Sequence, residues 1–231
     1  MTRNISILGD SISTYEGYNP AGYAVFYDSA CAVRNGMRSV YDTWWAQVIR
    51  SMGGMLCSNG SYSGSTVSGY RFPAGCSEQR VNALRGKYDP DIILIYLGFN
   101  DFGMGLPLRR LSGSKRDPYF FEDAYDIMLE RIRKTYPSAL VICGVPMRTV
   151  IRDSSFTFPE YFAGLPFEDY LNVIRRVSYQ YGCLTADLNT AADHYTTLDG
   201  THPDVLGHAE LAQAWISCLG KLRVIQGGNG Q

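Results

Sequence analysis

The sequence lacks an excess of charge of either sign. Its 231 residues include 21 lysines and arginines and 22 aspartates and glutamates, which gives a formal net charge of −1. This balance supports neither a nucleic acid nor an anionic membrane surface as a partner. The sequence also has no apolar run long enough to span a bilayer and no apolar leader region near residue 1. It therefore predicts a cytoplasmic protein without a membrane span.

Closely spaced cysteine pairs of the C-x-x-C type are missing as well. The six cysteines are scattered along the chain, and Cys57, Cys143 and Cys183 lie in or beside apolar strand candidates. Scattered cysteines in apolar surroundings are typical of free buried thiols. We therefore expect neither a disulfide framework nor a zinc site built from cysteine.

Histidine is scarce, with only His194, His202 and His208 in the chain. Their spacings match no metal-ligand pattern, so we expect no metal and no other cofactor. His208 falls within the last predicted helix, where we expect it to contact the surface or a neighbouring turn. His194 falls in a predicted loop.

The order of the secondary-structure signals predicts an α/β fold, because apolar strand candidates alternate with amphipathic helix candidates. We expect strands at residues 5–8, 55–58, 91–97, 139–145 and 183–187, and helices at 44–52, 77–86, 118–136, 167–181 and 205–222. Residues 91–97 are almost entirely apolar, as in a parallel strand buried on both faces. We predict one domain over residues 1–226, followed by a flexible tail of residues 227–231.

Three segments interrupt this alternation: residues 14–38, 102–117 and 146–166. Each follows the carboxyl end of a predicted strand, and this edge of an open α/β sheet is where ligands bind. The first and third segments are rich in aromatic residues, whereas the second contains glycine and basic residues. The basic residues either meet an anionic substrate group or remain solvated, and we expect them to be solvated; they are Arg109, Arg110, Lys115 and Arg116.

A candidate nucleophile, Ser11, follows the first predicted strand within Gly9-Asp10-Ser11-Ile12. A serine hydroxyl needs an adjacent base, and a histidine base needs a partner that fixes its tautomer. His202 follows Asp199 by three residues, a spacing at which one tight turn brings the carboxylate to the ring. Taken alone, this segment is more typical of an ordinary surface turn with an incidental histidine.

Acyl transfer also needs hydrogen-bond donors for the oxyanion that develops. Gly64, after the second predicted strand, offers a backbone N–H, and Asn100, after the central strand, offers a side-chain amide. Each segment alone is also typical of a turn. The α/β-hydrolase motif G-x-S-x-G is absent from the sequence, which argues for a different serine-hydrolase scaffold.

Together, the segments around Ser11, Gly64, Asn100 and His202 resemble the four sequence blocks of the SGNH, or GDSL-type, hydrolases. They occur in the order of that family and span residues 7–208. The resemblance implies a three-layer α/β/α sandwich of the flavodoxin-like type, with a five-stranded parallel sheet. It also implies ester hydrolysis through a covalent acyl-enzyme, without a metal.

The resemblance further implies roles for individual residues. The implied nucleophile, general base and orienting carboxylate are Ser11, His202 and Asp199. The implied oxyanion donors are the backbone N–H groups of Ser11 and Gly64 and the side-chain amide of Asn100. Two neighbouring carboxylates are expected to support these groups: Asp10 and Asp101.

The expected substrate is a small-molecule ester, such as a short acyl ester of a carbohydrate. Lipase- or lysophospholipase-like hydrolysis of longer acyl chains is an alternative, and a non-catalytic ligand-binding module on the same fold is another. A metal-dependent hydrolase would instead require activity that a chelator abolishes. The insertion at 14–38 has two interpretations. It either shapes the acyl or sugar pocket, or packs on the sheet edge or on another copy of the chain in a homo-oligomer.

Overall fold

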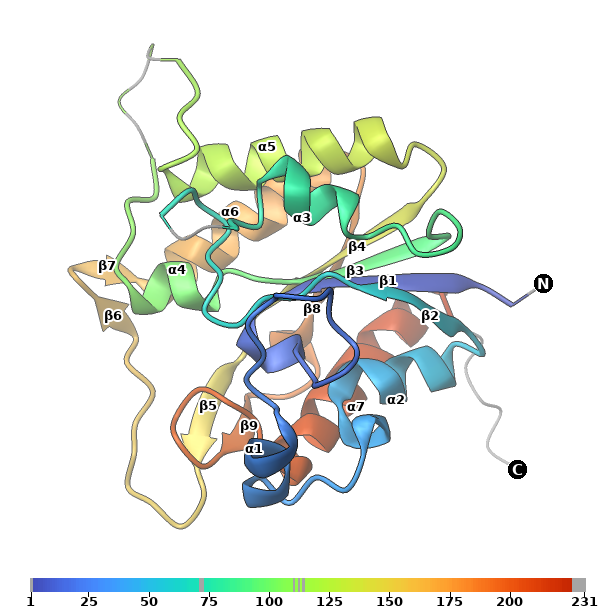
Figure 1. Cartoon of the computed structure of the whole chain (residues 1–231). Helices are drawn as coiled ribbons and strands as arrows, with labels where there is room; N and C mark the ends of the chain where they lie inside the picture. The colour runs from blue at the N-terminus through green and yellow to red at the C-terminus, as the bar shows by residue number, and fades with distance from the viewer. Residues whose placement is uncertain (1, 71–72, 110, 112, 114, 226–231) are drawn as a thin grey trace.

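The computed structural model is a three-layer α/β/α sandwich around a five-stranded sheet (Figure 1). The residues that the structure describes are 2–70, 73–109, 111, 113 and 115–225. The predicted tail at 227–231 lies outside these residues, and so does Arg110 of the basic segment. No helix in the described part of the chain is long and apolar enough to cross a membrane.

The central sheet is parallel throughout, in the order β2-β1-β3-β4-β8. Its strands are β1 (Asn4–Gly9), β2 (Met55–Asn59), β3 (Ile92–Tyr96), β4 (Leu140–Val145) and β8 (Leu184–Asp187). Each boundary lies within one residue of the prediction. Every residue of β3 is buried, which explains why its sequence is apolar throughout. The predicted fold class is confirmed.

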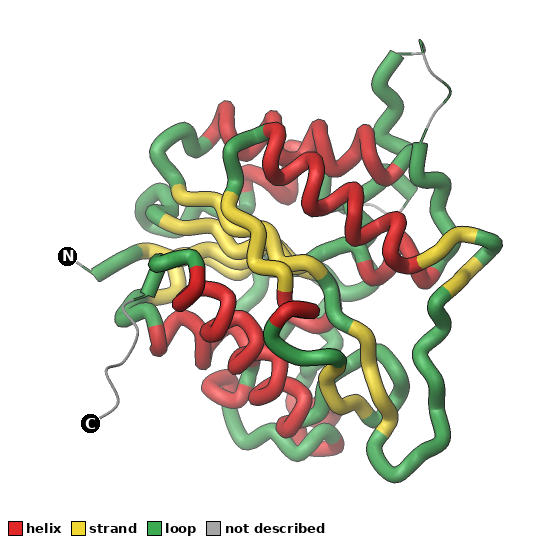
Figure 2. Tube along the Cα trace, turned by 180° about the vertical axis from the view of Figure 1, so that it is seen from behind, coloured by secondary structure: helices red, strands yellow, loops and turns green. Residues whose placement is uncertain are grey.

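Helices cover both faces of the sheet (Figure 2). One face carries α3 (Glu78–Asn82), α5 (Phe121–Thr135) and α6 (Phe167–Gln180), and the other carries α2 (Trp44–Ser51) and α7 (Val205–Lys221). The α3 helix is shorter than the predicted 77–86. Stacked indole rings of Trp44 and Trp215, with centroids 5.2 Å apart, join α2 to α7. The six cysteines are free thiols, as predicted, and all but Cys57 are buried.

The strand order places a ligand-binding edge beside β1 and β3. Connections from β1 lead outward to β2, whereas those from β3 lead in the opposite direction to β4 and β8. At such a switch point the loops after neighbouring strands separate and leave a crevice at their carboxyl ends. These ends lie on the left of Figure 1, the side on which Ser11 follows β1 and Asn100 follows β3.

Two of the three segments that interrupt the alternation, residues 14–38 and 146–166, are more ordered than predicted. The insertion contains α1 (Ser29–Arg34). A short helix, α4 (Phe99–Gly103), follows β3 and reaches the first two residues of the segment 102–117. Residues 146–166 contain three short strands rather than a long loop: β5 (Arg148–Ile151), β6 (Tyr161–Phe162) and β7 (Leu165–Pro166). Elements this short carry too little periodic sequence to be distinguished from loops.

His194 lies in a strand, so the expectation of a loop there is wrong. It begins β9 (His194–Thr197), which pairs in parallel with β5 to form a second, two-stranded sheet. The paired residues Arg148 and His194 are far apart in the sequence, so the pairing depends on the tertiary fold.

The basic segment is partly ion-paired rather than simply solvated. Arg109 contacts Glu122 at 2.6 Å, and Arg116 contacts both Asp126 and Glu130, so both arginines lie against α5. Because both arginine side chains are exposed to solvent, these pairs contribute little to stability.

His208 is fully buried, so of the two expected contacts, the surface and a neighbouring turn, the first is wrong. Its Nδ1 accepts a hydrogen bond from the backbone N–H of Trp44 at 3.2 Å, and its ring lies 4.9 Å from that of Tyr27. Burial, with a smaller contribution from His202, lowers the pKa of His208 from 6.5 to about 3. The imidazole therefore belongs to the core as a neutral acceptor.

We expect His208 to make folding stability pH-dependent. In the unfolded chain His208 binds a proton near its usual pKa of 6.5, whereas in the folded protein it stays neutral down to about pH 3. Its contribution to the free energy of unfolding should thus fall by about 1 kcal/mol per pH unit as the pH drops through this window. Chemical denaturation of the native protein and His208→Asn at several pH values measures this effect. A stability difference that stays constant with pH would contradict it.

Candidate active site

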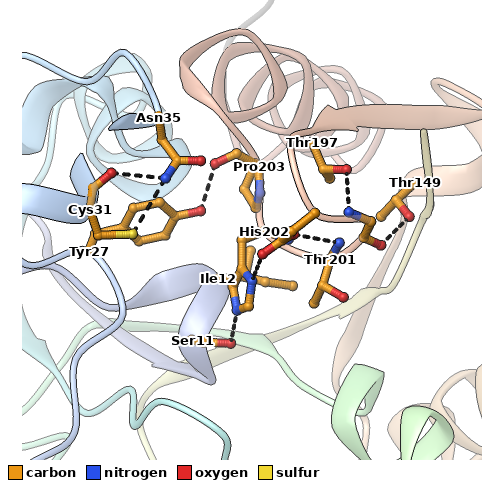
Figure 3. A network of polar contacts seen from close by, with 12 residues as sticks. Ser11, Ile12, Tyr27, Cys31, Asn35, Thr149, Thr197, Thr201, His202 and Pro203 are labelled. Carbon is orange, nitrogen blue, oxygen red and sulfur yellow. Dashed lines mark hydrogen bonds and ion pairs between the residues drawn. The ribbon is translucent and has the colours of Figure 1, made fainter. Parts of the chain in front are cut away.

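Ser11, His202 and Asp199 lie in one hydrogen-bonded row (Figure 3). The Oγ of Ser11 lies 2.9 Å from Nε2 of His202, and Nδ1 of His202 lies 2.7 Å from Oδ2 of Asp199. Both distances suit proton transfer from the hydroxyl to the ring and stabilisation of the resulting imidazolium by the carboxylate. The row joins segments 191 residues apart in the sequence.

Ser11 lies in a short 3-10 turn that Asp10 caps. Oδ1 of Asp10 accepts a hydrogen bond from the backbone N–H of Ile12 at 3.0 Å, and Thr14 Oγ1 donates to the Ser11 carbonyl at 2.9 Å. Burial raises the pKa of Asp10 to about 6, although the bond from Ile12 acts in the opposite direction. Asp10 thus holds the backbone on which the Ser11 side chain is presented.

The turn that presents His202 is held by the small second sheet. Gly200 has a φ of +88°, a left-handed conformation that favours glycine, and lies between Asp199 and His202. Its N–H donates to Thr197 Oγ1 at 2.9 Å, and its carbonyl accepts from Thr149 Oγ1 at 2.6 Å (Figure 3). Strands β5 and β9 therefore anchor this turn.

Asp199 carries an ionised carboxylate at neutral pH. Burial alone would raise the pKa of its carboxylate, but hydrogen bonds from the ring and backbone N–H of His202 outweigh burial and lower the pKa to about 2. The backbone N–H of Thr201 also donates to Oδ1 at 2.9 Å. The carboxylate can thus stabilise positive charge on His202.

The two predicted oxyanion segments are joined to each other. Gly64 adopts a φ of +76° in the turn after β2, and Asn100 lies in the first turn of α4. The Nδ2 of Asn100 donates to the carbonyl of Ser65, next to Gly64, at 2.9 Å. The Asn100 amide is therefore held against the Gly64 turn.

The side chain of Asp101 joins the same two segments by hydrogen bonds. This fully buried carboxylate accepts hydrogen bonds from the backbone N–H groups of Val67 and Ser68 and from the Ser68 hydroxyl, at 2.8, 3.1 and 2.8 Å. Burial raises its pKa to about 6, against the opposing effect of these bonds. Asp101 thus fixes the distance between α4 and the Gly64 turn.

Arg80 is a supporting residue that the sequence did not reveal. Its guanidinium is fully buried in α3, and burial lowers its pKa to about 10. It donates hydrogen bonds to the Gly9 carbonyl at 2.6 Å, the Gly60 carbonyl at 2.8 Å, the Pro73 carbonyl at 3.0 Å and the Ser65 hydroxyl at 2.6 Å. One side chain therefore joins the end of β1 to the loop after β2. The only signal for burial in the sequence was the spacing of Arg80 from the apolar residues of an amphipathic helix. Its residue type gave none, because arginine side chains are usually exposed.

The insertion packs against the segment that carries His202. The Tyr27 hydroxyl donates to the Pro203 carbonyl at 2.6 Å (Figure 3). The Val205 N–H donates to the Asn35 carbonyl at 2.8 Å. These contacts place the insertion beside the candidate site. In the described ranges, no three histidine, cysteine, aspartate or glutamate side chains are grouped as metal ligands.

The protein is thus an α/β/α sandwich with a hydrogen-bonded serine, histidine and aspartate at the carboxyl edge of its sheet, an arrangement suited to hydrolytic chemistry. The model of the GDSL-like lipase/acylhydrolase family matches residues 3–156, and the chain belongs to this family. The predicted resemblance is thereby confirmed. Membership of the GDSL-like lipase/acylhydrolase family implies that the protein is an ester hydrolase.

Solved structures share this fold over nearly the whole chain. A protein from Bacteroides ovatus ATCC 8483 described as a GDSL-like lipase is 25% identical, with a TM-score of 0.72 and coverage of 96% of this chain and 99% of the other. Another so described, from Bacteroides uniformis ATCC 8492, is 27% identical, with a TM-score of 0.68 and coverage of 96% and 95%. A family two carbohydrate esterase from Clostridium thermocellum is 17% identical, with a TM-score of 0.56 and coverage of 95% and 63%, and shares the fold. No curated protein matches the chain.

Proposed function

We propose that this protein is a serine esterase that hydrolyses short acyl esters of carbohydrates through an acyl-enzyme. The main support is the row formed by Ser11, His202 and Asp199, in which each pair is separated by a hydrogen-bond distance of 2.9 Å or less. A nucleophilic serine needs this arrangement at neutral pH.

In the first half of the reaction, the Ser11 Oγ attacks the ester carbonyl carbon while its proton passes to Nε2 of His202. The carbonyl oxygen becomes an oxyanion, which the backbone N–H groups of Ser11 and Gly64 and the Asn100 amide stabilise. The intermediate collapses when its bond to the alcohol oxygen breaks. His202 returns the proton to that oxygen, the alcohol departs, and the acyl group remains on Ser11.

In the second half, water replaces the alcohol. His202 removes a proton from a water molecule, whose oxygen attacks the acyl carbon and forms a second oxyanion at the same donors. Collapse breaks the bond to the Ser11 Oγ, which takes the proton back from His202. The acid leaves, and Ser11 and the neutral ring of His202 are regenerated.

Aromatic residues near the nucleophile support a carbohydrate as the alcohol part. The rings of Tyr23 and Tyr62 pack edge to face with centroids 5.2 Å apart, and the Tyr62 N–H donates to the Gly9 carbonyl at 3.2 Å, two residues before Ser11. Aromatic faces carry partial negative charge, which attracts the polarised C–H groups of a sugar ring. The structural relative described as a carbohydrate esterase is consistent with this choice.

Turnover of p-nitrophenyl esters from acetate to palmitate, together with labelling by a fluorophosphonate probe, tests the function. We expect the highest kcat/KM on the shortest esters, a mass increase on the peptide that contains Ser11, and release of acetate from acetylated cello-oligosaccharides. A maximum on long esters would instead indicate a lipase-like enzyme. If there is neither turnover nor labelling, the esterase proposal is wrong and a binding module is favoured.

Asn100→Ala should lower kcat by about 10²- to 10³-fold, because one donor to the oxyanion is lost. KM should change much less, because the ground-state ester carries little charge on the carbonyl oxygen. Steady-state kinetics on p-nitrophenyl acetate measure both values, and Asn82→Ala, which alters an exposed asparagine of α3, is the matched control. A rise in KM with an unchanged kcat would assign Asn100 to substrate binding instead.

A further inference from the structure

The ring of Phe26, in the insertion, is stacked on the imidazole of His202. The two centroids are 3.5 Å apart and the planes are inclined by only 9°. The edge of the imidazole is occupied by Ser11 at Nε2 and Asp199 at Nδ1. Phe26 therefore contacts one face of the ring while both nitrogens keep their partners.

Hydrogen bonds and ring contacts link Phe26 both to the segment of Ser11 and to the segment of His202. Its backbone N–H donates to Thr14 Oγ1 at 2.9 Å, and the same hydroxyl donates to the Ser11 carbonyl. Its neighbour Tyr27 packs edge to face on the Phe26 ring at 4.9 Å and bonds to the Pro203 carbonyl, next to His202. The position of the Phe26 ring is thus set relative to both the serine and the histidine.

A parallel stack has two consequences for a histidine that accepts a proton. It opposes rotation of the imidazole out of the plane that aims Nε2 at Ser11, because rotation would drive the ring into Phe26. It also places an electron-rich face against the imidazolium that forms as Ser11 loses its proton. The restraint on rotation acts throughout the reaction, whereas the attraction to the aromatic face is largest in the transition state, in which the imidazole carries charge.

We propose that Phe26 is a positioning residue for His202, which aims the imidazole and stabilises its protonated form. The inference rests on the proposed function, in which His202 is the general base. It assigns the aromatic insertion a role in the chemical step. An alternative role for the same side chain, as a wall of the acyl pocket, predicts a rise in KM rather than a loss in kcat.

Phe26→Leu and Phe26→Met remove the aromatic face and keep an apolar side chain, whereas Phe26→Tyr keeps the face. Tyr18→Leu, in the same insertion but packed on Tyr15 and Trp45, is the matched control. On p-nitrophenyl acetate, we expect the two ring-free variants to lose about 5- to 20-fold in kcat with KM nearly unchanged. Phe26→Tyr should retain most of the native kcat, and Tyr18→Leu should match the native protein. Thermal unfolding establishes that each variant is folded.

The low-field proton resonance of the His202–Asp199 hydrogen bond provides a readout that needs no turnover. We expect it to be sharp in the native protein and Phe26→Tyr, and broadened in Phe26→Leu, because an unstacked ring exchanges between orientations. Native kcat in the ring-free variants, or a rise in KM alone, would overturn the positioning role. An unchanged resonance would also overturn it. Loss of turnover in the native protein itself would reject the esterase function, and the resonance would then decide whether Phe26 orients the ring.

Discussion

Ser11→Ala should abolish ester turnover, with a loss in kcat of at least about 10⁴-fold. Without the Oγ no acyl-enzyme forms, and His202 and the oxyanion donors can promote only the slow direct attack of water. Because the substitution removes the bond to His202 but leaves the Asp10-capped backbone of the turn in place, the thermal unfolding temperature should change little. Initial rates on p-nitrophenyl acetate and a thermal scan of the same sample measure the two quantities.

Ser13→Ala is the matched control for this experiment, because Ser13 lies in the same turn. Its Oγ accepts a hydrogen bond from Nε1 of Trp44 at 3.2 Å and belongs to the core rather than to the row at His202. We expect near-native kcat, a loss of about 1 kcal/mol in stability, and full labelling by a fluorophosphonate. Labelling that persists in Ser11→Ala would place the nucleophile elsewhere.

His202→Gln should lower kcat by a similar factor, at least about 10⁴-fold. Glutamine can accept no proton from Ser11, so the hydroxyl remains protonated during attack. The double variant Ser11→Ala/His202→Gln should be no slower than either single variant, because residues that act as one unit give strongly non-additive losses. Steady-state kinetics on all three proteins test both expectations.

His194→Gln is the control for His202→Gln, because His194 is exposed at the start of β9 and lies outside the hydrogen-bonded row. It should keep the native kcat. Losses in the two single variants that multiply in the double variant would show that Ser11 and His202 act independently. The proposed proton transfer between them would then be incorrect.

The strands and long helices could be predicted because their signals are local. A strand buried on both faces, such as β3, is apolar at nearly every position, and an amphipathic helix such as α5 repeats its apolar residues every three or four positions. The short elements gave no comparable signal. Strands β5 and β9 consist of four residues each and pair across more than forty positions, so their formation depends on contacts that no local window contains.

The candidate site was predictable to the extent that its residues follow strands. Ser11 lies in the turn after β1 and Asn100 in the helix after β3, and the parallel pairing of these strands brings both to one edge. The sequence could not reveal Arg80 or Phe26, because a buried arginine and a stacked phenylalanine resemble exposed or core residues of the same type. His208 was misplaced for a similar reason: the helical pattern does not say which face meets Tyr27 and Trp44.

Sequence alone was sufficient for the α/β class, the five strands of the sheet and the family, because these depend on residue periodicity and on short motifs that remain intact along the chain. The tertiary structure determined which side chains meet. It brought the imidazole of His202 within hydrogen-bond distance of the Ser11 hydroxyl, although the two residues are 191 positions apart in the sequence. It also anchored the His202 turn on the β5–β9 sheet and stacked Phe26 on the imidazole. The physical reason is that hydrogen bonds and ring contacts act over a few ångströms in space, so they depend on how separated segments pack together.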